Sequence, residues 1–279
     1  MEFDFYGQSH PNETPELIKL KLKELDDELE KDSIDSKAAF EQAKLKCPEQ
    51  LTPKFKLVFL RCEVFNVDLA TKRLIRYWNK RLEVFGPDRA FLPLTLTQAL
   101  VDDETPLKIG FARLVEGTFD PIGRGVMLVD PSRLDKTKYS RESMVRAMWY
   151  TIHAALEVES TQRYGLVAIS FPRHAKFSQF DRELVKMILE SLKGYLPVRL
   201  SAIHICHPPS FLRLIFPIMK IFLGERLRKR VRVHGGSEYQ VLNLLADFGL
   251  LKEMLPVEIG GDKVVDQEKW LQSRIAEGK

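Results

Sequence analysis

The sequence is poor in cysteine and lacks the spacings that cysteine chemistry uses. Its 279 residues include three cysteines, Cys47, Cys62 and Cys206, and no two of them form a C-x-x-C pair. An odd number of cysteines without such a framework argues against a disulfide scaffold and is typical of a reducing compartment. We therefore expect a cytoplasmic protein.

Long apolar runs are also missing. The sequence has no stretch of eighteen apolar residues, so no transmembrane segment is predicted. Residues 1–16 contain no basic region followed by an apolar core, so we expect no signal peptide. Hydrophobic residues make up 44% of the chain and charged residues 29%, which is typical of a globular protein with one or two domains.

Motifs for catalysis, nucleotide binding or metal binding are absent as well. Without a G-x-S-x-G sequence, His234-Gly235-Gly236 has no serine partner, although it resembles the oxyanion loop of lipid esterases. The chain contains neither a G-x-x-x-x-G-K-[ST] nor a G-x-G-x-x-G phosphate loop. His204 and His207 would point to opposite faces of a strand, with no further ligand pair nearby. We therefore predict no catalytic residue, no cofactor and no metal site, and hence no enzyme.

Residues 1–107 predict an all-helical N-terminal region after a loose tail. A helix start is indicated at residues 14–16, where a capping Thr14 precedes a proline and an acid. A polar stretch at 32–36 leads to a second helix that is expected to end near Cys47-Pro48. Asp68 is placed to cap a long amphipathic helix that Gly86-Pro87 should end.

From about residue 108 short apolar runs alternate with amphipathic segments. Strands are predicted at 125–130, 165–171, 200–205 and 231–234, and helices at 142–163, 181–194 and 237–252. This alternation predicts an α/β fold with a mostly parallel sheet covered by helices. We expect this domain to span residues 108–262 and to be followed by a polar C-terminal tail at 263–279.

The segment 211–223 is apolar on almost every side. It follows Pro208-Pro209, and its two charged residues, Arg213 and Lys220, share one face of a helix. Such a helix must be covered by protein, by lipid or by both in turn, and at about 20 Å it is too short to span a bilayer core of about 30 Å. We predict that this segment contacts a lipid or a membrane, with plain core packing as the alternative. The predicted contact residues are Phe211, Leu214, Ile215, Ile218, Met219 and Phe222.

A basic run follows directly. The net charge of +4 is modest, but residues 213–232 contain seven Lys or Arg and a single acid, Glu225. Near an anionic membrane each such cation contributes about 1 kcal/mol. We predict that Arg226, Arg228 and Arg230 bind an anionic, phosphoinositide-containing membrane, with a solvated basic loop as the alternative. No aromatic residues are interleaved in the run, so nucleic acid is not an expected partner.

Several motifs resemble, in order, those of the CRAL-TRIO family of lipid-transfer proteins. They extend over about two hundred residues, from 59 to 261. They comprise FLRCEVFNVD at 59–68, DPIGRGV at 120–126, LPVRL at 196–200, HPP at 207–209, IFL at 221–223 and LPVEIGG at 255–261. ESTQR at 159–163 and RVRVHG at 230–235 are similar to the branch that carries tocopherol and retinaldehyde.

The resemblance implies a sheet beneath a lipid cavity that is closed by a mobile gate helix, which falls on residues 211–223. It also implies a phosphoinositide site formed by basic residues. Arg199, Arg226 and Arg230 match positions of that site, whereas Ser201 and Glu63 stand where the family has basic residues. The expected function is therefore a carrier that binds a hydrophobic lipid and exchanges it at anionic membranes. The alternative is a membrane-recruitment or adaptor module whose partner docks on the N-terminal helices.

Two further departures concern the phosphatidylinositol-transfer branch of the same family. That branch has an Arg-Lys pair where this chain has Glu63-Val64, and a glutamate where it has Val198. These differences argue against an inositol headgroup inside the cavity. Phe171-Pro172 also replaces the family's Asp-Leu after the second predicted strand, so a different turn is expected there.

Overall fold

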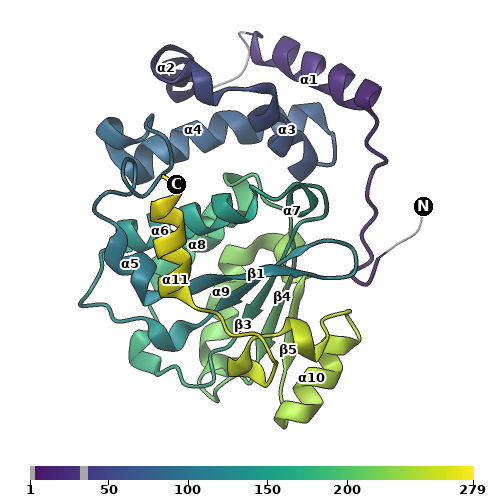
Figure 1. The fold of residues 1–279 in the computed structure, drawn as a ribbon, viewed down its shortest axis with the longest axis vertical. Helices are drawn as coiled ribbons and strands as arrows, with labels where there is room; N and C mark the ends of the chain where they lie inside the picture. Colours follow the sequence, from purple (N-terminus) through teal and green to yellow (C-terminus); the bar gives the residue numbers. More distant parts are fainter. Residues whose placement is uncertain (1–3, 32–36) are drawn as a thin grey trace.

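The N-terminal helices form one layer of the computed structural model, which describes residues 4–31 and 37–279. These helices are α1 (Pro15–Leu29), α2 (Ala38–Lys46), α3 (Pro53–Cys62) and α4 (Val67–Arg89). Figure 1 shows the layer lying across one end of the sheet. The predicted helical N-terminal region is confirmed for the described residues. The polar stretch predicted at 32–36 and the first three residues of the predicted tail lie outside them.

Local capping explains where these helices begin. The Thr14 side chain accepts a hydrogen bond from the first turn of α1, as its position before a proline predicts. The cap of α4 is Asn66 and not Asp68, because Asn66 has an extended backbone whereas Asp68 already lies in the first turn. The predicted end at Gly86-Pro87 is a kink, where Gly86 has a φ of 73°, and α4 continues beyond it.

The sheet has five strands in the order β1-β2-β3-β4-β5 in the described part of the chain. The strands are β1 (Ala112–Phe119), β2 (Gly125–Val129), β3 (Leu166–Ser170), β4 (Leu200–Cys206) and β5 (Val231–His234). Only β1 and β2 are antiparallel; the other neighbours are parallel. The predicted α/β fold with a mostly parallel sheet is therefore confirmed.

Strand β1 was not predicted from the sequence. Its pattern is interrupted because Arg113 is charged yet buried, and Gly117 has a positive φ of 63° near an irregularity in the pairing with β2. Arg113 is buried beside Glu258, whose carboxylate accepts a hydrogen bond from its guanidinium at 2.7 Å. This partner is 145 residues away in the chain, so local periodicity does not indicate that Arg113 belongs to a strand.

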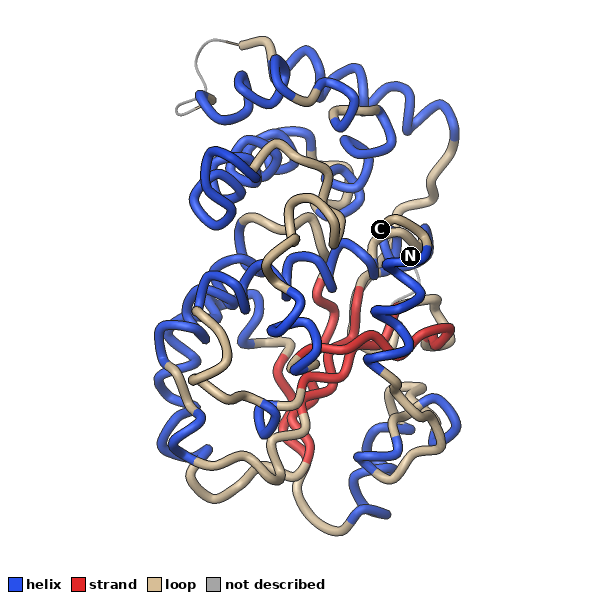
Figure 2. The backbone as a smooth tube through the Cα atoms, turned by 60° about the vertical axis from the view of Figure 1, so that its left-hand side comes forward, coloured by secondary structure: helices blue, strands red, loops and turns tan. Residues whose placement is uncertain are grey.

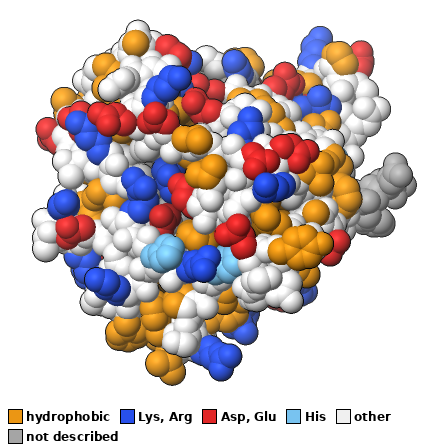
Figure 3. All heavy atoms as spheres, turned by 60° about the horizontal axis from the view of Figure 1, so that its bottom comes forward, with side chains coloured by type: hydrophobic (Ala, Val, Ile, Leu, Met, Phe, Trp, Pro, Cys, Tyr) orange, Lys and Arg blue, Asp and Glu red, His pale blue; other side chains and the backbone are white. Residues whose placement is uncertain are grey.

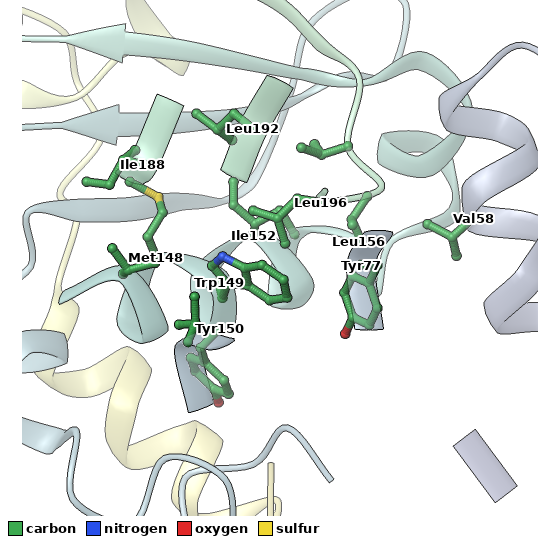
Figure 4. Close-up of a cluster of buried hydrophobic side chains, with 14 of the residues drawn as sticks. Val58, Tyr77, Met148, Trp149, Tyr150, Ile152, Leu156, Ile188, Leu192 and Leu196 are labelled. Carbon is green, nitrogen blue, oxygen red and sulfur yellow. The ribbon is translucent and has the colours of Figure 1, made fainter. Parts of the chain in front are cut away.

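Helices cover both faces of the sheet, as Figure 2 shows. One face packs against α6 (Arg141–Ala155), α8 (Arg182–Gly194) and α9 (Leu212–Arg228), and its apolar cluster continues into the N-terminal helices. In Figure 4, Tyr77 of α4 lies in the same cluster as Trp149 of α6 and Leu192 of α8. The other face packs against α10 (Glu238–Ala246) and forms a second apolar cluster.

Three helical predictions need correction. The single helix expected at 142–163 is two helices, α6 and α7 (Glu159–Tyr164), because Val158 between them is extended. Helix α10 begins with the predicted capping box at Ser237 but ends at Ala246, before residue 252. The expected polar tail contains α11 (Gln267–Ala276), whose Trp270 is buried in the main core.

The remaining short elements lie in the connections. They are the helix α5 (Glu104–Ile109) and the 3-10 turns η1 (Pro48–Gln50), η2 (Pro131–Arg133), η3 (Phe177–Gln179), η4 (Lys252–Met254) and η5 (Val257–Ile259). Of these, η3 contributes to the candidate site, because it lies beside the start of α9: the rings of Phe177 and Phe211 pack edge to face, with centroids 5.9 Å apart.

An apolar cavity beside a basic pocket as the candidate functional site

Helix α9 is broken near its end. It begins at Leu212, contains Pro217, and is interrupted at Gly224, where φ is 67° and ψ is 170°. The predicted apolar segment, 211–223, therefore ends at a true break. Beyond Gly224 the helix resumes and includes Arg226 and Arg228, whose side chains are exposed. Their binding to a membrane stays a prediction.

The apolar residues of α9 face two ways. Ile215 and Leu223 are buried, whereas Leu214 and Ile221 are 71% and 73% exposed. The exposed pair lies seven residues apart and so shares one side of the helix. One side of α9 thus packs against protein, and another presents large aliphatic side chains to the surroundings.

A cavity of about 180 Å³ lies between the inner side of α9, the sheet and α8. It is smaller than the roughly 300–1,000 Å³ that is usual for ligand sites. Its wall is almost entirely apolar and includes Met127 and Ala168 of the sheet and Met148 of α6. Met148 and Ile188, which both line the cavity, lie in the apolar cluster of Figure 4.

This geometry divides the six residues in and next to α9 that were predicted to contact a lipid. Phe211, Ile215 and Met219 line the cavity. Leu214 faces outward, and Ile218 and Phe222 are partly buried outside the cavity lining. The contact of these residues with a lipid stays a prediction.

Few polar groups reach the cavity, and two of the four are already engaged. Gln179 donates hydrogen bonds to the backbone carbonyls of Ser132 and Leu134 at 2.7 and 2.9 Å. Asp181 caps α8 and pairs with Arg141 at 2.8 Å. The other two are Ser170 and Lys176. A cavity with so little free polarity favours a ligand that is itself mainly hydrocarbon.

A second pocket, of about 220 Å³, opens beside the Gly224 break and is lined by cations. The cations in its wall are Arg73, Lys193, Arg199, Arg226 and Arg230. Three of the four predicted phosphoinositide residues therefore meet here. The fourth, Arg228, is exposed and is not part of the wall. We call this site the basic pocket.

The basic pocket and the apolar cavity share part of their walls. Leu192 of α8, Leu200 of β4 and Leu223 of α9 line both. A change in the position of α9 near Gly224 would therefore alter both spaces at once.

Two arginines of the basic pocket carry unbalanced charge. Arg199 is 6% exposed, and its Nη1 donates to the Arg163 carbonyl at 3.1 Å, while its Nε has no partner among the described residues. Burial, together with Arg124 and Arg226, lowers the pKa of Arg199. Burial, with Arg226 and Arg199 next, lowers the pKa of Arg230 to about 10. An anion in this pocket would relieve the repulsion and restore the lost solvation.

Two cations of the basic pocket, Arg73 and Lys193, were not predicted from the sequence. Arg73 lies on α4, and its Nη atoms donate to the carbonyls of Leu196 at 2.8 Å and Lys193 at 3.2 Å. These bonds join the N-terminal helices to the segment that leads into β4. Arg73 and Lys193 lie 120 residues apart in the chain, so only the packing of α4 on α8 could reveal them.

The histidines form a pair that the sequence analysis did not predict. The Nδ1 atom of His204 in β4 lies 2.8 Å from Nε2 of His234 in β5, and its Nε2 atom lies 3.0 Å from the Tyr6 hydroxyl. Burial, then His234, lowers the pKa of His204 to about 3. In residues 4–31 and 37–279 no group of three or more His, Cys, Asp or Glu side chains is arranged to hold a metal ion.

A mostly parallel sheet with an apolar cavity under a broken apolar helix defines a class of proteins that bind hydrophobic ligands in their interior. A family model described as the CRAL/TRIO domain matches residues 113–261, which is just over half of the chain. The chain belongs to this family of lipid-binding proteins. The crystal structure of Sfh5 has the same fold, with a TM-score of 0.56 and 15% sequence identity over 96% of this chain and 100% of that chain.

Two groups of curated relatives are more similar in sequence. An alpha-tocopherol transfer protein-like protein of Mus musculus is 31% identical over 217 residues, which are 76% of this chain and 59% of that protein. Clavesin-2 of Rattus norvegicus is 28% identical over 213 residues, which are 74% of this chain and 61% of that protein. The chain thus spans about three fifths of the length of these relatives. Within the described residues, no helix combines the length and the apolar character needed to cross a bilayer.

Proposed function

We propose that this protein binds one hydrophobic lipid in the cavity under α9 and transfers it between membranes, docking through the basic pocket. The observation that carries the proposal is the shared wall formed by Leu192, Leu200 and Leu223. It places a nearly hydrocarbon-lined cavity directly beside a cluster of arginines. An anionic membrane that engages the arginines therefore faces the helix that closes the cavity.

Helix α9 is the proposed gate. Its inner side contacts the cavity, and its outer side carries the exposed Leu214 and Ile221. A helix that is apolar on both sides exchanges a protein contact for a lipid contact at little hydrophobic cost. The cavity of about 180 Å³ has to widen for a ligand of ordinary size, and outward movement of α9 about Gly224 would widen it.

Docking is proposed to rest on Arg199, Arg226 and Arg230, with the exposed Arg228 adding longer-range attraction to an anionic surface. Figure 3 shows the end of the molecule opposite the N-terminal helices, where apolar and basic side chains are intermixed. The basic pocket lies at the other end of the sheet, because Arg73 of α4 and Leu200 at the start of β4 line it. At a bilayer interface, aliphatic groups of α9 would enter and the cations of the pocket would stay with the headgroups.

The cargo is tested by mass spectrometry of an organic extract of the purified protein. We expect one lipid per protein molecule, released when the protein is denatured. Protein that carries no lipid, and takes up none from vesicles, would favour the adaptor function instead.

The gate is tested by linking η3 to the start of α9. Phe177→Cys and Phe211→Cys introduce thiols where two rings pack 5.9 Å apart, and the described native cysteines are buried. A short, reducible thiol crosslinker should trap the bound lipid and stop transfer between vesicles, and reduction should restore transfer. The uncrosslinked double variant is the control. Transfer by the crosslinked protein at the control rate would show that α9 is not the gate.

A further inference from the structure

The basic pocket has a carboxylate of the protein bound at its edge. Glu63 follows α3 and is 7% exposed. Its Oε1 atom accepts a hydrogen bond from Nε of Arg73 at 2.5 Å, and its Oε2 atom accepts one from Nη1 of Arg226 at 3.5 Å. One internal anion thus engages two of the cations that face the pocket.

The backbone after Glu63 adopts a conformation that favours this placement. Val64 and Phe65 have φ angles of 54° and 59°, in the left-handed region that β-branched and bulky residues rarely enter. Such a conformation persists only where the surrounding structure enforces it. The turn ends α3 just before α4 and leaves the Glu63 side chain among the arginines.

Two further arginines of the pocket, the buried Arg199 and the half-buried Arg230, have no carboxylate partner in the described chain. Arg199 bonds to the imidazole of His10 and to a backbone carbonyl, and Arg230 donates to the backbone carbonyl of Leu200. Lys193 and Glu225 also line the pocket, but both are exposed, so water and salt screen their charges, and Glu225 pairs with Lys229 at 2.7 Å. Glu63 therefore leaves the positive charges of Arg199 and Arg230 available to a ligand.

The pKa shifts also distinguish Arg73, which is paired with Glu63, from Arg199 and Arg230, which have no carboxylate partner. Burial works to lower the pKa of Arg73, but the adjacent Cys62 and Glu63 outweigh it, and the pKa is raised. The pKa values of Arg199 and Arg230 are lowered, because burial and neighbouring guanidinium groups act in the same direction. The cation next to Glu63 is stabilised by that carboxylate, and the other two remain in need of an anion.

We infer that Glu63 restricts the basic pocket to lipid headgroups with a single phosphomonoester. Such a group carries a charge of about −1.5 to −2 at neutral pH, which Arg199 and Arg230 balance. A second phosphomonoester would have to approach the Glu63 carboxylate or take Arg226 from it, and like charges at this distance repel. This inference rests on the proposed docking function and adds the class of headgroup.

The direct test compares two phosphatidylcholine vesicles, one with phosphatidylinositol 4-phosphate and one with phosphatidylinositol 4,5-bisphosphate, brought to equal surface charge with phosphatidylserine. The wild-type protein should bind the monophosphate vesicles more tightly. Glu63→Gln should raise affinity for the bisphosphate about tenfold relative to the monophosphate, since one repelling charge is removed and Arg226 is freed. Glu157→Gln removes the same charge from a pair with Arg274, distant from the pocket, and should leave the ratio unchanged.

A double-mutant cycle of Glu63→Gln and Arg226→Gln separates the effect of the Glu63 charge from a change in the shape of the pocket. In the wild-type background, where Glu63 holds Arg226, Arg226→Gln should weaken binding to both vesicles alike and leave the ratio of the two affinities unchanged. In the Glu63→Gln background it should abolish the gain in affinity for the bisphosphate. A wild-type protein that prefers the bisphosphate, or a Glu63→Gln variant with an unchanged ratio, overturns the inference. If Glu63→Gln does not fold, the wild-type preference alone decides.

Failure of the inference and failure of the docking proposal give different results. Arg230→Gln should weaken binding to both vesicles several-fold if the basic pocket is the docking site. Equal binding by Arg230→Gln and wild type rejects the docking site itself. If Arg230→Gln weakens binding but the wild-type protein binds both vesicle types equally, only the role of Glu63 is rejected. Release from the monophosphate vesicles by inorganic phosphate at constant ionic strength would identify free phosphate as the ligand and reject the lipid headgroup.

Discussion

Gly224 of α9 lies directly against the side chain of Lys193 of α8: a Cβ atom added to the glycine would stand 3.1 Å from Cε of the lysine. The two residues occupy the place where the apolar cavity and the basic pocket meet. The break in α9 thus depends on glycine for two reasons, its backbone angles and the space that Lys193 leaves.

Gly224→Ala should destabilise the protein by about 1–3 kcal/mol, because φ 67° with ψ 170° is a region that residues with a Cβ avoid. Urea unfolding should show a lower midpoint. Gly194→Ala is the matched control, because it lies at the end of α8 with nothing within 4 Å of an added Cβ, and it should not lower the midpoint. An equal decrease of the unfolding midpoint in both variants would show that the break at Gly224 has no special requirement for glycine.

Leu214→Asp and Ile221→Asp should slow lipid transfer between vesicles several-fold without unfolding the protein. Both side chains are more than two thirds exposed, so a charge there costs little in water, but it opposes entry into a bilayer. Thermal melting and a fluorescent transfer assay measure the two effects. Leu45→Asp, at a side chain 84% exposed on α2, should change neither. Unchanged transfer in all three variants would exclude insertion of α9.

His153 should make the protein less stable in acid. Its Nδ1 lies 2.7 Å from the Trp149 carbonyl, which can only accept, so Nε2 is left to accept from the Tyr77 hydroxyl at 3.1 Å. Burial is the main cause that lowers its pKa to about 4. Because the unfolded state then binds the proton more readily, stability is full above about pH 6.5 and falls by about 3 kcal/mol towards pH 4.

The measurement is urea unfolding of wild type and His153→Asn between pH 7 and pH 4. The variant should be less stable at pH 7 but should lose less stability on acidification. The other histidines with lowered pKa values, among them His204, leave a residual pH dependence in both proteins. Parallel curves for the two proteins would show that His153 does not titrate in this range.

Trp270→Ala should destabilise the protein by about 3–5 kcal/mol, as expected for a large aromatic side chain removed from a core. Trp270 is 6% exposed, and the neighbouring Arg274 pairs with Glu157 at 2.6 Å. Ile275→Ala, on the exposed side of the same helix, should cost much less. A similar unfolding midpoint for Trp270→Ala and wild type would mean that α11 does not contribute to the core.

Much of the framework could be predicted because its signals are local. Neighbouring residues indicate four of the five strands. They also indicate the helix cap at Thr14 and the capping box at Ser237. Strand β1 and helix α11 could not be predicted in this way. Arg113 is buried because Glu258 pairs with it, and Trp270 is buried because it meets the core built by other elements. Neither partner is near in the sequence.

The sequence by itself determined that residues 211–223 form an apolar helix and that cations follow it. Only the tertiary structure decided that Ile215 faces a cavity while the adjacent Leu214 faces outward, because both are aliphatic and their difference is the side on which the sheet lies. The same holds for the basic pocket. Arg73, Arg199 and Glu63 have charges that the sequence shows, but which of them balance and which remain free depends on distances that only packing sets.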